Sequence, residues 1–153
     1  MTGQAIARDE TLGTQLATQA EQNAVRNFLA AIDNATASRD LDQFLALMSD
    51  DVVVLAPDIP SLVGKAAVGE FYRNLFTAFV PDPQGTHQTE AIDVVGDIVI
   101  DRGHFSGNLT PVGGGEPIRA RSKYLFILRK KSDGVLILWR AVFNSDAPRP
   151  TGQ

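Results

Sequence analysis

The feature that most constrains this chain is the pattern of its last third, residues 96–146, where apolar and polar side chains alternate over three long stretches. Such alternation is typical of β-strands, because successive side chains point to opposite faces of a sheet. Two turn sequences, "PVGGGEP" and "KSDG", separate the stretches, and in the second Gly134 can supply the positive φ of a tight hairpin. The region therefore predicts a long antiparallel meander with one apolar face.

The segments that precede the meander predict helices that cover this face. Apolar residues recur at helical spacing in residues 16–37 and 65–79, and Asp40 is a candidate N-cap for a short helix over residues 41–48. Residues 52–56 and 86–95 predict further strands. About three N-terminal helices packed on a mostly antiparallel sheet make an α+β, helix-on-sheet cup, and a cup of this size can enclose a small molecule.

The length of 153 residues fits one domain, which we place at residues 16–147. Residues 1–15 are polar with few apolar anchors, and we expect them to form a flexible segment. Residues 148–153 are expected to form a C-terminal tail.

The composition excludes several classes of function. The net charge of −4 and the pI of about 5.0 argue against a nucleic-acid partner or an acidic membrane surface. The absence of cysteine excludes disulfides, thiolate catalysis and cysteine-based metal sites. The N-terminus has no apolar run long enough for a signal peptide or a membrane span, so we expect a cytoplasmic location.

Asp101 is the polar residue that the strand pattern singles out. Alternation places it on the same face as Val99, Gly103 and Phe105. On a covered face, loss of water would raise the pKa of its carboxyl group and suit it to proton transfer. At the open rim of the sheet, Asp101 would instead be solvated or paired with an arginine, and the pattern leaves both arrangements open.

Tyr124 lies on the apolar face of the following strand, where its hydroxyl can bind either a ligand carbonyl or a backbone group. The two histidines, His87 and His104, lie on different strands, whereas a zinc site needs three or four converging ligands. We therefore expect no metal and no cofactor.

Five segments give the chain a family resemblance: "RNFLAAID", "DLDQFLALMSDDVVVLAP", "LVGKAAVGEFYRNLF", "GDIVIDRGHF" and "SKYLFILRKKSDGVLILWRAVFNSD". They cover roughly residues 20–147, and their order resembles the NTF2-like superfamily, in its SnoaL-like and ketosteroid-isomerase-like branch. This resemblance implies an α+β cone, in which about three N-terminal helices pack on a curved, mostly antiparallel sheet. The last segment is similar to the DUF4440 group, which includes SgcJ/EcaC-like proteins. The superfamily contains isomerases, cyclases, dehydratases, hydrolases and non-catalytic binding or assembly modules, so the resemblance implies a fold rather than one reaction.

Ketosteroid isomerases use a carboxylate base together with two oxyanion donors. The resemblance places Phe28 at the position of the donor tyrosine and Ala56 at the position of the base, and it places Tyr124 near the second donor. Phenylalanine and alanine side chains can neither donate nor accept the protons concerned. Ketosteroid isomerisation is therefore not expected.

Two functions remain. The first is a cofactor-independent isomerase or cyclase acting on a small hydrophobic, polyketide- or steroid-like molecule, with Asp101 moving a proton and Tyr124 stabilising an oxyanion. The second is a non-catalytic small-ligand-binding or assembly module, which the lack of a base at position 56 favours. For either function, the residues expected to contact the ligand are Phe28, Ala56, Tyr72, Phe105, Phe126, Trp139 and Phe143.

The other face of the predicted sheet suggests self-association. There Arg102, His104, Arg121 and Lys123 alternate with apolar residues that would otherwise be exposed. We therefore expect a homodimer formed through this outer face.

Overall fold

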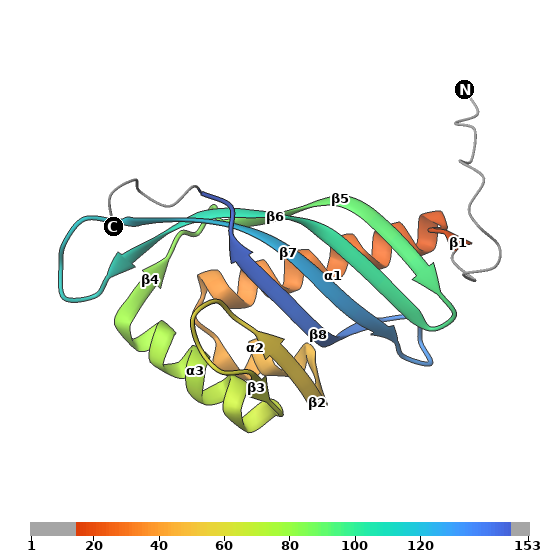
Figure 1. Ribbon diagram of the computed structural model, residues 1–153, viewed down its shortest axis with the longest axis horizontal. Helices are drawn as coiled ribbons and strands as arrows, with labels where there is room; N and C mark the ends of the chain where they lie inside the picture. The colour runs from red at the N-terminus through yellow and green to blue at the C-terminus, as the bar shows by residue number, and fades with distance from the viewer. Residues whose placement is uncertain (1–14, 148–153) are drawn as a thin grey trace.

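The computed structural model describes residues 15–147 (Figure 1). The expected flexible N-terminal segment, apart from Gln15, and the expected C-terminal tail lie outside the described residues. Within that range the chain forms a mixed α+β structure in which helices lie against one curved sheet.

Three helices occur in the described range: α1 (Gln19–Ala37), α2 (Leu41–Ala46) and α3 (Lys65–Ala78). A capping box begins α1, because the Thr18 hydroxyl accepts from the Glu21 N–H while the Glu21 carboxylate accepts from the Thr18 N–H. Asp40 caps α2, as predicted, by accepting a hydrogen bond from the Gln43 N–H.

The sheet of the described residues contains eight strands in the order β1-β5-β6-β7-β8-β2-β3, with β4 paired to β6. Strands β5 to β8 form the predicted antiparallel meander, and β2 adds to β8 in parallel. The register shifts in the β5–β6, β7–β8 and β2–β8 pairs, and bulges of this kind bend a sheet. The strand bounds are β1 (Gln15–Leu16), β2 (Met48–Leu55), β3 (Leu62–Val63), β4 (Phe79–Pro81), β5 (Thr86–Val95), β6 (Ile98–Pro111), β7 (Ile118–Lys130) and β8 (Leu136–Ser145).

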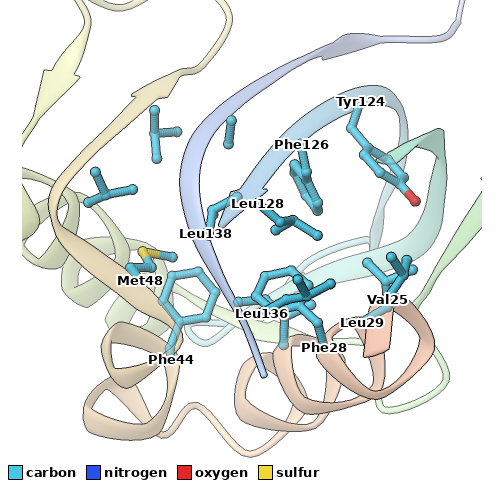
Figure 2. Close-up of a cluster of buried hydrophobic side chains, with 14 of the residues drawn as sticks. Val25, Phe28, Leu29, Phe44, Met48, Tyr124, Phe126, Leu128, Leu136 and Leu138 are labelled. Carbon is cyan, nitrogen blue, oxygen red and sulfur yellow. The ribbon is translucent and has the colours of Figure 1, made fainter. Parts of the chain in front are cut away.

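The hydrophobic core lies between the helices and the inner face of the sheet (Figure 2). Val25, Phe28 and Leu29 project from α1 toward Phe126 and Leu128 of β7. These side chains are almost completely buried, so the apolar stripe of α1 and the apolar face of the meander stabilise each other.

The structure differs from the prediction at the start of β2 and in three short strands. Strand β2 begins at Met48, which the sequence pattern assigns to the end of a helix. The reason is tertiary pairing: Leu138 of β8 donates its N–H to the Leu47 carbonyl, which draws the chain out of α2 and into the sheet. Strands β1, β3 and β4 were not predicted because two or three residues carry no detectable periodicity.

Candidate functional site

A cavity of about 250 Å³ lies between the helices and the inner face of the sheet. Its wall is mainly apolar and aromatic, with contributions from α1, α3, residues 81–85 and strands β6 to β8. A concave apolar site with a few polar groups is the usual form of a small-molecule site. The polar side chains of the wall are Asp33, Thr36, Tyr72, Asp82, His87, Asn108, Ser122 and Tyr124.

The best-defined polar pair in the wall is Asp33 of α1 with His87 of β5. The Nδ1 atom of His87 lies 2.5 Å from Oδ1 of Asp33, and the His87 backbone N–H donates to Oδ2 over 3.1 Å. Because a carboxylate can only accept, Nδ1 must carry the hydrogen of this contact. Proton exchange with a ligand then falls to Nε2.

Aromatic rings hold the imidazole of His87 in place. Its ring centroid lies 4.8 Å from that of Phe105, 5.1 Å from that of Tyr124 and 5.4 Å from that of Phe126. All four of these side chains line the cavity. The imidazole is therefore oriented by Asp33 on one side and by packed rings on the others.

Asp101 lies behind this wall and is completely buried. The Tyr124 hydroxyl donates to its Oδ2 atom over 3.0 Å, while Oδ1 has no hydrogen-bond partner within the described residues. Burial raises the pKa of the Asp101 carboxyl, and the hydrogen bonds with the side chains of Thr89 and Tyr124 and the charge of His87 oppose this effect only in part. Burial and the neighbouring Asp101 carboxyl also raise the pKa of Tyr124.

This placement decides between the two arrangements that the sequence leaves open for Asp101. Strand alternation holds from Val99 to Gly103, so Asp101 lies on the covered face, away from the rim. Asp101 is nevertheless not among the residues that line the cavity; it is linked to the cavity by its hydrogen bond with Tyr124, which does line it.

Gly103 makes the Tyr124–Asp101 contact possible. It pairs with Tyr124 across β6 and β7. A Cβ atom at this position would lie 2.0 Å from the Gln88 carbonyl oxygen and 2.8 Å from the Tyr124 hydroxyl. Only a residue without a side chain leaves room for both groups.

The expectation that Trp139 contacts the ligand is corrected by the structure. Trp139 is not among the cavity-lining residues; its indole N–H donates to Asp51, and its ring stacks against the guanidinium groups of Arg129 and Arg140. The cause is a bulge in β8, where Leu128 pairs with Leu138 but Ile127 pairs with Arg140. Trp139 is the extra residue of the bulge, so Leu138 faces the cavity in its place, while Ala141 and Phe143 beyond the bulge line the cavity.

The other predicted ligand contacts fall into two groups. Tyr72, Phe105, Phe126 and Phe143 line the cavity. Phe28 and Ala56 are not lining residues. Phe28 is a core residue that meets Phe126 edge to face, with ring centroids 6.4 Å apart, and Ala56 packs at the margin of the core. Whether the lining residues contact a ligand stays a prediction.

Asp33 is a site residue that sequence reasoning missed, and His87 was considered there only as a zinc ligand. Asp33 is the one acidic residue between Glu21 and Asp40, and it lies four residues after the buried Leu29. A carboxylate beside the apolar stripe of a helix was therefore a signal. Its partner could not be identified, because His87 lies 54 residues further along the chain.

Two further observations describe what residues 15–147 contain. No three His, Cys, Asp or Glu side chains in this range are grouped so that they could hold a metal ion. None of its helices has both the length and the apolar character needed to cross a membrane.

The fold and the cavity define a class of protein, a cone-shaped α+β domain with a small-molecule cavity. Residues 25–143 match the model of the SnoaL-like domain, and the chain belongs to this family. Its resemblance to the NTF2-like, ketosteroid-isomerase-like fold is thereby confirmed. A search among curated proteins finds no match.

Solved structures share this fold. A ketosteroid isomerase-like protein from Erwinia carotovora atroseptica is 24% identical, with a TM-score of 0.68 over 83% of this chain and 94% of that one. A conserved protein from Planctomyces limnophilus is 23% identical, with a TM-score of 0.75 over 84% and 99%. ActVI-ORFA from Streptomyces coelicolor is 14% identical, with a TM-score of 0.68 over 82% and 96%. At these identities the similarity shows the fold alone.

Proposed function

We propose that the protein binds a small hydrophobic carbonyl compound and catalyses a cofactor-independent proton transfer on it, as an isomerase or cyclase does. The observation that carries this proposal is the Asp33–His87 pair in the wall of an apolar cavity. A histidine whose Nδ1–H is held by a carboxylate is oriented to act as a general base through Nε2.

The proposed reaction begins when Nε2 of His87 removes a proton from the carbon next to the ligand carbonyl. The electron pair of that C–H bond forms an enolate, whose negative charge develops on the carbonyl oxygen. The Tyr124 hydroxyl then stabilises this oxygen. In an isomerisation, the protonated His87 returns its proton to another carbon of the conjugated enolate. In a cyclisation, the enolate carbon attacks a second carbonyl carbon of the same ligand, the π bond of that carbonyl breaks, and its oxygen takes the proton from His87.

Asp101 supports Tyr124 in this scheme. Because its pKa is raised, Asp101 is suited to hold its proton. In the proposed reactive state the direction of the Tyr124–Asp101 hydrogen bond is reversed, so that the protonated Asp101 donates to the Tyr124 oxygen. The phenolic hydrogen is then available to the ligand. Asp101 is thus proposed to position Tyr124, while His87 takes the role of base that the sequence suggested for Asp101.

The scheme differs from that of ketosteroid isomerases in the residues that carry it. Their base and helix tyrosine correspond by resemblance to Ala56 and Phe28, neither of which can move a proton. The finer resemblance of the last two strands to the DUF4440 group stays a prediction and adds nothing to the mechanism.

Deuterium exchange tests this function. The protein is incubated in heavy water with methyl naphthyl ketone, and NMR follows the loss of the protons next to the carbonyl. We expect exchange faster than in buffer, and His87→Gln should slow the enzymatic rate by roughly a hundredfold or more. Asp33→Asn should also slow it, because the imidazole loses its orienting partner.

The matched control is His104→Gln, which removes the other histidine. His104 lies on the outer face of the sheet, between Glu90 and Asp146. Its replacement should leave the exchange rate unchanged. Exchange in His87→Gln at the rate of the wild type would contradict the proposal that His87 is the base. A ketone that binds but exchanges no faster than in buffer supports the second function, a non-catalytic binding module, which the largely apolar wall also suits.

A further inference from the structure

We infer that the cavity accepts an uncharged ligand of one or two rings and rejects both carboxylates and four-ring molecules. The inference deepens the proposed function and rests on it only in taking this cavity as the ligand site. It follows from the charges of the wall and from the volume that the wall encloses.

The wall offers no cation to an anionic ligand. Among the described residues, the charged or ionisable lining groups other than tyrosines are Asp33, Asp82 and His87, with no lysine or arginine. Both oxygens of Asp33 bind His87, one through Nδ1 and one through the backbone N–H. A protonated His87 is thus already neutralised by its own carboxylate.

An anionic ligand would therefore lose water without gaining a partner. A buried charge is tolerated only when it is paired and hydrogen-bonded. Asp82, whose Oδ1 already accepts the Gln84 N–H, adds a second negative charge to the wall. Recognition of a carboxylate or phosphate usually relies on arginine or lysine, and this wall supplies neither.

An uncharged ligand meets more suitable groups. The hydroxyls of Ser122 and Tyr124 and the amide of Asn108 can bind a carbonyl or hydroxyl oxygen without a charge. The remaining wall is rich in aromatic side chains, including Phe71, Phe105 and Phe143, which favour contact with a flat ring.

The volume limits the number of rings. An engineered cavity of roughly 150 Å³ in another protein binds one benzene molecule. The cavity here measures about 250 Å³, which is enough for two fused rings, so the third and fourth rings of a steroid would extend beyond the part that the wall lines. The expectation of a steroid-like ligand, drawn from family resemblance, is therefore narrowed to smaller molecules.

Methyl naphthyl ketone and naphthoate form a matched pair that tests the charge. They have the same ring system and nearly the same shape, and they differ by a methyl group in place of a charged oxygen. Calorimetric titration at pH 7 should give an affinity for the ketone at least tenfold higher than for naphthoate. A four-ring steroid diketone, titrated in the same way, should bind at least tenfold more weakly than the naphthyl ketone.

The variant Asp82→Asn tests the source of the rejection. Its side-chain oxygen can still accept the Gln84 N–H, so the local turn is kept. The affinity for naphthoate should rise severalfold while that for the ketone stays unchanged. Asp97→Asn removes the same charge from an exposed position in the turn between β5 and β6, and it should leave both affinities unchanged.

Three results would overturn the inference: naphthoate binding as tightly as the ketone, the steroid binding as tightly as the two-ring ketone, or no binding of the ketone at all. Failure of the proposed catalysis is read separately, from the deuterium exchange of the bound ketone. A ketone that binds with the expected selectivity but does not exchange refutes the catalysis and leaves the ligand class in place.

Discussion

At the scale of single residues, the site buries a carboxyl group whose hydrogen bonds with the side chains of Thr89 and Tyr124 do not offset its loss of water. Asp101 is fully buried, and within the described residues its Oδ1 atom lacks a partner. A neutral carboxylic acid tolerates such a position far better than a carboxylate does. The raised pKa of Asp101 is therefore a consequence of the fold, and it makes stability depend on pH.

The variant Asp101→Asn should reveal this dependence. Below pH 3.8, the ordinary pKa of an aspartate side chain, Asp101 holds its proton in both the folded and the unfolded chain, so its burial does not bury a charge. As the pH rises above that value, the unfolded chain releases the proton while the folded chain retains it, so the free energy of unfolding of the wild type falls. Between pH 4 and pH 7 the free energy of unfolding of the wild type should therefore fall, relative to that of Asp101→Asn, by on the order of 1 kcal/mol.

Urea unfolding at a series of pH values and constant ionic strength measures this difference. Asp97→Asn, in an exposed turn, is the control and should show no such trend. A difference between wild type and Asp101→Asn that stays constant over the pH range would contradict a raised pKa at Asp101.

At the scale of elements, the close approach of β5 to β6 determines where the Tyr124 hydroxyl lies. The register of this pair shifts between Thr89 and Ala91, and Gly103 faces Thr89 beside the shift. The bulge and the glycine together bring the Gln88 carbonyl and the Tyr124 hydroxyl to the same place on β6.

Gly103→Ala should therefore destabilise the protein by about 1–3 kcal/mol, because the added methyl group overlaps the Gln88 carbonyl oxygen and must displace a strand. The control is Gly113→Ala in the loop between β6 and β7, where a Cβ would meet nothing within 4 Å. That change should alter the free energy of unfolding by less than about 0.5 kcal/mol. Equal stability of the two variants in urea would show that β5 and β6 are not in this close contact.

At the scale of the whole molecule, the outer sheet face still carries the prediction of a homodimer. Its charged groups pair with each other: Arg102 and His104 both contact Glu90, and His104 also contacts Asp146. Beside them Val142 is exposed by 38%. We propose that a second copy of the chain covers Val142 and the charged groups around it.

Light scattering at micromolar concentration should give the mass of two 16.5 kDa chains. Val142→Glu should shift the mass toward one chain, because it places a charge in the proposed contact. The same variant should leave the affinity for methyl naphthyl ketone unchanged, since Val142 does not line the cavity. A wild-type mass of one chain would refute the dimer.

Much of the fold could be predicted because its determinants are local. The period of two along β6 and β7 correctly placed Tyr124 on the covered face and put Asp101 on the same face as Val99, but only the structure decided that Asp101 is buried there and not solvated at the rim. The N-cap at Asp40 and the positive φ of Gly134 depend on a few neighbouring residues, and both are present. The family resemblance added the cone, which short-range patterns do not specify.

The sequence by itself thus determined the side-chain alternation of the long strands and where α2 and the hairpin turns begin, because side-chain period and turn chemistry act over a few residues. The start of α1 was predicted at residue 16, but Leu16 pairs in β1 and the helix begins at Gln19. The tertiary structure alone decided which side chains meet. Asp33 contacts His87 only because α1 packs across the start of β5, and Trp139 leaves the cavity only because β8 bulges against β7. Contacts between distant segments depend on the register and packing of whole elements, and a single extra residue in one strand reverses the facing of all that follow it.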